Sequence, residues 1–492
     1  MAASADSDTA PAFTRLWHWF VPSTTQWLWL ILLVVLLAQP WQTTMVSSDG
    51  DTCMHWRVGE YMLQTGHIIR KDVFSHTRFG WPIVSKEWLS EIAFAVAGRV
   101  AGLYGLVVVA ALVIATTFAF LHHRLLQETG NHTVAILVAF IAAWAASAHW
   151  LARPHVFSFL MAALWGDALR RFERPQSARR LFMTLTGFTM LWVNLHGGYL
   201  AGFVTLGAYW LGAAMERDRR KFGTLTAVGL LCCGASLLNP DTYKLHVYNI
   251  RFLRSDFFKN WLAEYSSVRF GSPDALGFAV WLALVFLTLA LCRPKLSPAA
   301  ALVVIVWTYF ALYAARNIPL MAIFTAPIIA APLSEAKWVP WQALEIPLQV
   351  GHRSRGWPLA AATAVIAITC IPHPTAMSAD RWPAAAVEFI QRHPERFTGN
   401  MFNQYAWGGY LMEVLPEYKV FVDGRTDFYG EQLLEEFSDV TALHSNWTQI
   451  LTKYDVAWTL MPADHRLNAA LPLLGWQAIY TNNVTTIFRR PP

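Results

Sequence analysis

Long apolar runs alternate with short polar links along residues 24–372. A helix that crosses a membrane needs about 20 mostly apolar residues, and fewer where flanking aromatic residues complete the crossing. About eleven segments come close to this pattern, namely 24–40, 103–121, 133–150, 155–170, 181–195, 199–215, 224–238, 275–292, 299–315, 317–333 and 357–372. The pattern predicts a polytopic α-helical membrane protein with about 11 transmembrane helices.

Basic residues gather in the short links on one side of these segments. The links at 170–180, 216–221 and 293–295 are rich in arginine and lysine, and such links remain in the cytoplasm. This orientation places the N-terminal segment 1–23 inside and three long segments outside, namely 41–88, 239–274 and 373–492. The sequence therefore predicts a multi-pass protein of the cytoplasmic (inner) membrane whose transmembrane domain covers 24–372.

The last segment, 373–492, differs from the rest because short strand and helix patterns alternate in it. We expect a short amphipathic helix around 388–390, further helices at 431–443 and 446–454, and strands at 400–402, 419–423, 456–461, 476–480 and 484–488. Asn482-Asn483, between the last two strands, is a hairpin turn signal. Strands that alternate with helices indicate an α/β layer, so we predict a C-terminal extracytoplasmic α/β domain.

Composition supports the membrane assignment. Hydrophobic residues make up 55% of the 492 residues and charged residues 14%, whereas a soluble globular protein has roughly a quarter of its residues charged. With a mean hydropathy of +0.34, the chain is neither disordered nor an ordinary soluble protein. The net charge of +6 is scattered, so no nucleic acid partner is expected. The five cysteines form no disulfide framework and no paired C-x-x-C metal spacing.

The first outer segment opens with candidate chemistry. Asp49 and Asp51 flank Gly50 directly after the first apolar segment, and His55 follows Asp51 after four residues. A carboxylate there could act as a general base that takes a proton from an acceptor hydroxyl. The pair could also hold a divalent cation such as Mg²⁺ or Mn²⁺ against a phosphate. A solvated helix-capping turn explains the same residues, and the sequence leaves these alternatives open.

The same segment ends with two more carboxylates. Residues 88–98 have the pattern of an amphipathic helix lying on the membrane, and Glu87 and Glu91 are one helical turn apart on one face of it. Glu87 is therefore a candidate for binding substrate. Interfacial packing is the alternative for this stretch, and it accounts well for the aromatic residues.

Two arginines depart from the charge distribution of the other links. Arg153 and Arg316 are isolated cations in very short outer links. A cation near the apolar zone is costly and indicates a pathway or an anionic ligand, and guanidinium groups bind phosphate oxygens through bidentate, charge-assisted hydrogen bonds. Snorkelling toward the lipid head groups is the alternative.

Further polar residues lie at the same outer ends of the apolar segments. The candidates for binding substrate are His55, Glu87, His155, Asn194, His196, Asn239 and Asn317. A tight turn at Gly197 and Gly198 explains part of this pattern without a ligand. Asp423 and Arg425 either form a turn with an internal salt bridge or face the membrane site as acceptor contacts. One face thus combines carboxylates with cations, which suits a lipid with a phosphate head group.

In layout, the chain resembles the GT-C superfamily of membrane glycosyltransferases, which use polyprenyl-phosphate-linked sugars, and more narrowly a bacterial GT-C-like group. The superfamily has a long first outer loop with a catalytic Asp near its start, a second long loop after the seventh span and often an extracytoplasmic domain. The motifs that carry the resemblance are Asp49-Gly50-Asp51 with His55, Asp72-Val73-Phe74-Ser75, Glu87-Trp88-Leu89, Asn194-Leu195-His196-Gly197-Gly198, and Trp407-Gly408-Gly409-Tyr410 with Asp423-Gly424-Arg425. No W-W-D motif occurs in the C-terminal segment, which argues against an ordinary oligosaccharyltransferase.

The resemblance implies an inverting hexosyl- or pentosyltransferase that acts at the outer face of the membrane, with Asp49 or Asp51 as the general base. In this interpretation, Arg153 and Arg316 bind the donor phosphate, the acceptor is a glycan, a lipid or a protein, and membrane lipids and envelope-assembly proteins are further partners. No cofactor is certain, and a divalent cation would bind at Asp49 and Asp51. The alternatives are a non-enzymatic transporter or flippase for lipid-linked saccharides, an envelope-assembly scaffold, and a metal-dependent transferase that moves a phosphoryl group onto lipids.

Overall fold

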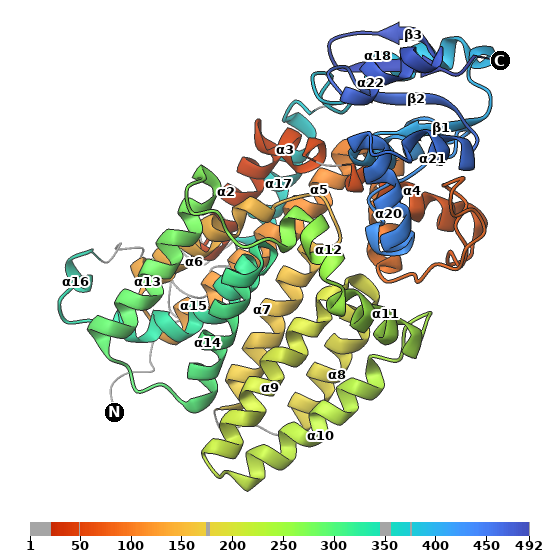
Figure 1. The fold of residues 1–492 in the computed structure, drawn as a ribbon. Coiled ribbons are helices and arrows are strands. Elements are labelled where there is room, and N and C mark those ends of the chain that lie inside the picture. Colours follow the sequence, from red (N-terminus) through yellow and green to blue (C-terminus); the bar gives the residue numbers. More distant parts are fainter. Residues whose placement is uncertain (1–20, 49, 174–177, 345–355, 374–375, 492) are drawn as a thin grey trace, which may run out of the picture.

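A bundle of long helices makes up most of the computed structural model (Figure 1), which describes residues 21–48, 50–173, 178–344, 356–373 and 376–491. The helices of the bundle are α2 (Thr24–Leu37), α5 (Trp88–Thr129), α6 (His132–Ala146), α7 (His155–Phe172), α8 (Ala178–Leu195), α9 (Leu200–Met215), α10 (Arg219–Ala235), α13 (Leu276–Cys292), α14 (Pro298–Tyr313), α15 (Ile318–Ser334) and α17 (Trp357–Cys370). Each apolar segment expected from the sequence falls on one of these helices. The short α16 (Trp341–Leu344) lies between α15 and α17.

Fewer helices than eleven have the full length and composition of a membrane span. Among the described residues, five helical stretches qualify: Trp88–Thr129, His132–His149, Gly197–Met215, Pro273–Cys292 and Ala315–Ser334. The pair formed by α2 and α3 (Trp41–Ser47), bent by 63°, would be a sixth, and α14 and α17 are shorter apolar helices. The fold is thus that of a helical membrane protein, and the count of 11 spans stays a prediction.

The long helix α5 is interrupted near its start. Ala101 and Gly102 depart from helical backbone angles, and the φ of Gly102 is 58°, a conformation that glycine adopts at little cost. The interruption falls between the amphipathic stretch 88–98 and the apolar stretch 103–121, so the two predicted pieces are separate helical segments.

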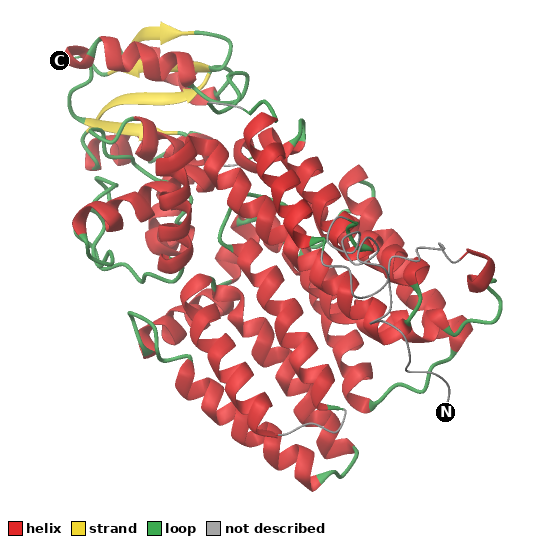
Figure 2. Cartoon of the chain, turned by 180° about the vertical axis from the view of Figure 1, so that it is seen from behind, coloured by secondary structure: helices red, strands yellow, loops and turns green. Residues whose placement is uncertain are grey.

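The long connecting segments gather at one end of the bundle, at the upper right of Figure 1. This end comprises α3, α4 (Asp51–Thr65), α11 (Tyr243–Arg254), α12 (Asp256–Trp261), the 3-10 turns η3 (Ala263–Tyr265) and η4 (Pro273–Ala275), and the C-terminal residues 376–491. The short links from α9 to α10 and from α13 to α14 lie at the opposite end, and Figure 2 shows the same division from behind. Arginine-rich links and long segments are therefore at opposite ends, as the charge distribution predicts.

The C-terminal residues form a small α/β unit. Its four-stranded sheet has the order β1-β2-β4-β3, with β1 parallel to β2 and the other neighbours antiparallel. Its strands and helices are β1 (Asn400–Asn403), β2 (Val456–Pro462), β3 (Gln477–Thr481), β4 (Thr485–Arg489), α18 (Ala384–Arg392), α19 (Gly408–Val414), α20 (Thr426–Ala442), α21 (Trp447–Lys453) and α22 (Arg466–Ala470), with the turns η6 (Pro394–Arg396), η7 (Tyr405–Trp407) and η8 (Leu471–Leu474). Four predicted strands and the three predicted helices are present.

The predicted strand at 419–423 is wrong. These residues are buried like a strand, with Val420 fully inaccessible, but their backbone groups bond elsewhere. Val420 donates to the carbonyl of Phe74 at 3.0 Å and accepts from the amide of His76 at 3.1 Å, and Phe421 donates to the side chain of Asn403 at 2.8 Å. The first long loop therefore satisfies this segment in place of a neighbouring strand, because every buried backbone group needs a partner.

Candidate active site

A cavity of about 1660 Å³ lies where the bundle, the long connecting segments and the C-terminal unit meet. Nine candidate residues from the sequence line it: Asp51, His55, Glu87, Arg153, His155, His196, Arg316, Asn317 and Arg425. Asp49 lies outside the described residues. Residues far apart in the chain thus share one space at the end of the bundle where the long segments gather.

Asp51 begins α4 and is held between the bundle and the C-terminal unit. Its Oδ2 lies 2.8 Å from Nη2 of Arg153, and a carboxylate in the first turn of a helix is stabilised by the helix dipole. Gly424 of the C-terminal unit approaches so closely that an added Cβ would lie 1.7 Å from Oδ1 of Asp51. Two further glycines allow close contact between α4 and the C-terminal unit. A Cβ on Gly50 would meet the carbonyl oxygen of Ala406, and a Cβ on Gly409 would meet the carbonyl oxygen of Gly50.

Two arginines share one carboxylate beside Asp51. Glu264 of η3 places Oε1 3.1 Å from Nη1 of Arg316 and Oε2 3.7 Å from Nη1 of Arg153. The guanidinium of Arg316 also lies over the ring of Tyr265, 4.4 Å from its centroid. Burial alone would raise the pKa of Glu264, but Arg316 and Arg153 outweigh it and lower the pKa to about 2. The carboxylate is therefore ionised at neutral pH.

His55, one helical turn after Asp51 in α4, forms a second cluster with two carboxyl groups. Its Nδ1 lies 3.2 Å from Oε1 of Glu91 and 3.8 Å from Oε2 of Glu87. Oε1 of Glu87 faces Nε2 of His196 at 3.4 Å. Burial lowers the pKa of His55 against the opposing effect of Glu87 and Asp51, and burial with Arg316 lowers that of His196 well below its usual value. Burial therefore disfavours the protonated form of both imidazoles.

The cluster of His55, Glu87 and Glu91 fits a divalent cation. One ligand atom from each residue lies within 4.8 Å of the others, and all three face the cavity. A nitrogen with two carboxylate groups is a donor set that several divalent metals accept. Asp51 is engaged with Arg153, so among the described residues the candidate metal ligands are His55, Glu87 and Glu91, whereas the sequence suggested Asp49 and Asp51.

A lysine and an aspartate join the first loop to the C-terminal unit. Nζ of Lys86 pairs with Oδ2 of Asp427 in α20. Burial alone would lower the pKa of Lys86, but Asp427 and Glu87 raise it above its usual value. Both residues line the cavity together with Tyr248, so the pair belongs to the wall of the site.

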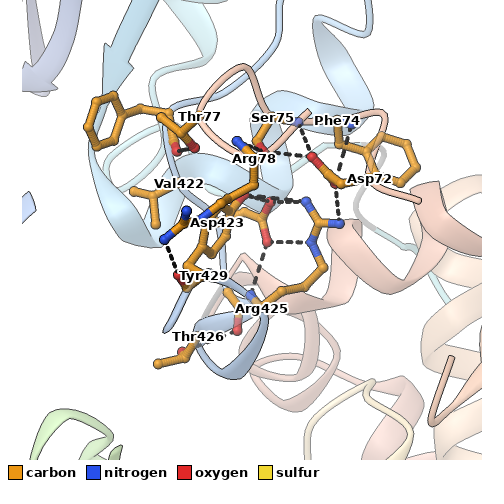
Figure 3. A network of polar contacts seen from close by, with 12 residues as sticks. Asp72, Phe74, Ser75, Thr77, Arg78, Val422, Asp423, Arg425, Thr426 and Tyr429 are labelled. Atoms are coloured by element: carbon orange, nitrogen blue, oxygen red, sulfur yellow. Dashed lines mark hydrogen bonds and ion pairs between the residues drawn. The ribbon is translucent and has the colours of Figure 1, made fainter. Parts of the chain in front are cut away.

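Arg425 lies at the centre of a buried network that reaches the same wall (Figure 3). It bonds Asp423 through Nε at 2.8 Å and through Nη2 at 2.6 Å, and Asp72 of the first loop through Nη1 at 2.6 Å. The hydroxyl of Tyr429 donates to Asp423 at 2.5 Å, and that of Ser75 donates to Asp72 at 2.6 Å. Asp423 is fully buried and absent from the cavity wall, whereas Arg425 contributes to that wall. The internal salt bridge considered from the sequence is present.

Solved structures with the same architecture exist for membrane enzymes. The oligosaccharyltransferase of Archaeoglobus fulgidus in its apo form matches 92% of this chain and 70% of its own, with a TM-score of 0.59 and 13% identity. AglB of the same organism, in complex with an inhibitory peptide and a dolichol-phosphate, matches 98% of this chain and 75% of its own, with a TM-score of 0.59 and 13% identity. ArnT from Cupriavidus metallidurans bound to undecaprenyl phosphate matches 95% of this chain and 98% of its own, with a TM-score of 0.56 and 14% identity.

The chain has the GT-C fold. Neither protein-family models nor curated proteins match the sequence. The similarity therefore lies in the arrangement of the helices and the C-terminal unit. The roles of the cavity residues have to be argued from this chain itself.

Two of the substrate contacts predicted from the sequence lie outside the cavity wall. Asn194 accepts a hydrogen bond from Nε1 of Trp88 at 2.7 Å and donates to the carbonyl of Leu238 at 2.9 Å. Asn239 donates to the carbonyls of Ser236 and Thr242 at 2.8 and 3.1 Å. Both asparagines join helix ends to loops, so we leave them out of the candidate site.

Several residues of the cavity wall could not be predicted from the sequence. Asp427 lies in a stretch where acidic residues are common, and Glu264 is a single acidic residue in a largely aromatic loop, so neither belongs to a recognisable motif. Glu91 and Lys86 are close to Glu87 in the sequence. Their contacts could not be predicted, because their partners lie in other segments of the chain. The signal that could have found Glu264 is its position in the second long loop, which the resemblance already places at the outer face.

Proposed function

We propose that the chain is a membrane glycosyltransferase that moves a hexosyl or pentosyl group from a polyprenyl-phosphate-linked donor to a glycan, lipid or protein acceptor. The observation that carries this proposal is one cavity lined by Asp51, Arg153 and Arg316, in which Asp51 lies 2.8 Å from Arg153. AglB and ArnT, which have the same fold, are solved with dolichol-phosphate and undecaprenyl phosphate respectively. These ligands support a lipid phosphate as the donor class.

Asp51 is the proposed general base, with Asp49 as the alternative from the sequence. It takes the proton of the acceptor hydroxyl, whose oxygen forms a bond to the anomeric carbon of the donor. The bond from that carbon to the phosphate oxygen breaks with inversion, and the phosphate leaves with the bonding electrons. Arg153 and Arg316 stabilise the leaving phosphate, because fixed charge aimed at developing charge is often the largest contribution to catalysis.

The remaining cavity residues orient the substrates. His155, His196 and Asn317 line the space around the two arginines and are suited to hold sugar hydroxyl or phosphate oxygens. His55, Glu87 and Glu91 would hold a divalent cation, which would supply a Lewis acid for a phosphate oxygen. Arg425 and Asp427 of the C-terminal unit also line the cavity, so we assign contacts with the acceptor to this unit.

The proposed topology follows the charge distribution. With about 11 spans, the arginine-rich links face the cytoplasm, and the cavity and the C-terminal unit face the outside of the cytoplasmic membrane. The bundle end that carries the cavity is the one opposite those links (Figure 1). A lipid-linked donor would then reach the cavity from the outer leaflet.

Mass spectrometry of copurifying lipids tests the proposal. Wild-type protein is expected to retain a polyprenyl phosphate or its glycoside, and a variant with both Arg153→Ala and Arg316→Ala is expected to lose it. The retained glycoside then names the sugar for a transfer assay. The same lipid profile in both proteins, together with full transfer by Asp51→Asn, would exclude the proposed site and favour a transporter or scaffold.

A further inference from the structure

The loop that follows α12 delivers a carboxylate into the proposed phosphate site. Glu264 is three residues after the end of α12, in the short turn η3, and it faces the cavity between Arg153 and Arg316. Each of its oxygens lies nearer to a different arginine, at 3.1 Å from Arg316 and 3.7 Å from Arg153. Two oxygens on one atom, shared between two guanidinium groups, are also what a single phosphate group presents.

We propose that Glu264 is an internal competitor of the donor phosphate. The donor phosphate must displace Glu264 from the two arginines before transfer, and Glu264 returns to the arginines when the product phosphate is released. This inference rests on the proposed function, since it assigns the two arginines to phosphate. It adds a specific role to a residue of the second long loop.

Electrostatics explain why a carboxylate occupies this position. Arg153 and Arg316 face the same cavity, and two like charges in a partly desolvated space repel each other and lose hydration. Glu264 neutralises part of this charge, and the arginines in turn keep it ionised. A phosphate that enters the site must therefore replace one anion by another, rather than bind to a bare pair of cations.

The charges of donor and product differ in a way that gives the exchange a direction. A lipid-phosphate sugar is a phosphodiester with one negative charge. The Glu264 carboxylate has the same charge. The lipid phosphate left after transfer is a monoester with a charge of about −1.5 to −2 at pH 7. The product therefore attracts the arginines more strongly than the donor does, and a resident carboxylate that competes for them shortens its stay.

The short turn that carries Glu264 is not part of a helix of the bundle. η3 is a turn of three residues between α12 and the loop leading to α13. A hydrogen bond of 3.1 Å from the amide of Ala315 to the carbonyl of Ser266 attaches the loop to η5 (Ala315–Asn317) beside Arg316. Glu264 can thus leave the arginines through rotation of its side chain or a shift of η3, without disturbing a helix of the bundle.

Binding of undecaprenyl phosphate to the full-length protein in nanodiscs tests the inference. Glu264→Gln is expected to lower the Kd about tenfold, because one competing charge-assisted contact is removed. Glu264→Asp keeps the charge on a shorter side chain, and it should give a smaller decrease. Glu60→Gln is the matched control, since Glu60 pairs with Arg99 at 2.8 and 2.9 Å and is absent from the cavity wall. Its Kd should equal that of the wild type.

The outcomes separate the inference from the proposed function. Weaker binding by Arg316→Gln, with tighter binding by Glu264→Gln and Glu264→Asp, supports both. Weaker binding by Arg316→Gln, with unchanged or weaker binding by both Glu264 variants, overturns the inference and leaves the phosphate site in place. Unchanged binding by Arg316→Gln overturns the phosphate site and the inference together. Inorganic phosphate, as a second probe, shows whether the effect depends on the lipid chain.

Discussion

At the scale of single residues, Asp51 has the most demanding position in the molecule. Its carboxylate lies 2.8 Å from a guanidinium nitrogen of Arg153, and the backbone of Gly424 packs against it. A general base needs this combination of charge and fixed geometry. The same pairing means that an arginine attracted to the donor phosphate would release Asp51 for the acceptor proton.

Asp51→Asn should therefore reduce sugar transfer by about 10²- to 10⁴-fold, the usual contribution of a general base. Binding of undecaprenyl phosphate should change little, because the arginines remain. The measurement is a transfer assay with the glycoside identified from copurified lipids. Asp256→Asn is the control, as Asp256 is 89% exposed and should leave transfer at the wild-type rate. Transfer by Asp51→Asn at the wild-type rate would refute the assignment of this residue.

Glu413 makes the free energy of unfolding depend on pH. It lies in α19, and its Oε2 is buried with no hydrogen-bond partner among the described residues. Burial raises the pKa of Glu413 from 4.5 to about 7. The folded state thus holds this proton more tightly than the unfolded state. The free energy of unfolding therefore falls as the pH rises from about 4.5 to about 7, and remains low above that range.

Glu413→Gln should remove this loss, which amounts to about 3 kcal/mol. Thermal unfolding in detergent at pH 5 and pH 8 measures it. The melting temperature of the wild type should fall more between these values than that of the variant, and the variant should be the more stable protein at pH 8. Equal shifts in the two proteins would show that Glu413 does not titrate in this window.

At the scale of elements, the contact between α4 and the C-terminal unit depends on glycine. Gly424→Ala would place a Cβ 1.7 Å from the Asp51 carboxylate, so the two segments must move apart. We expect transfer to fall at least tenfold, because a small misplacement of a catalytic group can cost about 10²-fold. Gly234→Ala on α10 is the matched control, since an added Cβ there meets nothing within 4 Å. Full transfer by Gly424→Ala would mean that this contact can relax freely.

The network around Arg425 fastens the first loop to the C-terminal unit, and Asp72 is its most sensitive member. Asp72→Asn removes one of two carboxylates from a buried arginine, and breaking such a pair costs about 3 kcal/mol or more. Hydrogen exchange should then rise at residues 72–78 and 419–425, and the melting temperature should fall. Glu388→Gln, which breaks the exposed pair with Arg392, should change neither, because exposed pairs contribute little. Unchanged exchange in Asp72→Asn would show that Asp423 alone holds Arg425.

The elements differ in how far the sequence predicts them. Apolar runs and alternating patterns locate the helices of the bundle and four of the strands, because those patterns depend only on nearby residues. The segment 419–423 has the composition of a strand, yet its partner is the loop at 74–76. Nothing in the local pattern encodes that pairing. The same holds for the pairs Lys86–Asp427 and Arg153–Glu264, whose members come from different segments.

At the scale of the whole molecule, the charge of the links predicts the orientation in the membrane. Alkaline phosphatase fused after Pro492 should be active, and green fluorescent protein fused there should be dark, if the C-terminal unit is outside. A phosphatase fusion within the link 216–221 should be inactive. Activity in that link, or fluorescence at the C-terminus, would reverse the proposed topology.

The sequence predicts the type of fold, but it does not determine the number of membrane spans. Long apolar runs indicate a membrane protein, and the layout of long and short links indicates the GT-C fold that the solved structures share. Whether an apolar helix spans the membrane or is a shorter buried helix depends on the helices that pack against it. Helices such as α14 and α17 fall in this range, where a span of marginal length is completed by its packing partners.

The closeness of Gly424 to Asp51 also concerns how the protein is made. A ribosome synthesises about 5–20 residues per second, so Asp51 emerges tens of seconds before the backbone that fixes it. Throughout membrane insertion the nascent chain therefore exposes an incomplete pocket to a lipid-rich surface. Under the proposed function, catalytic competence would come only after Gly424 has been made, so a product truncated before Gly424 would transfer no sugar.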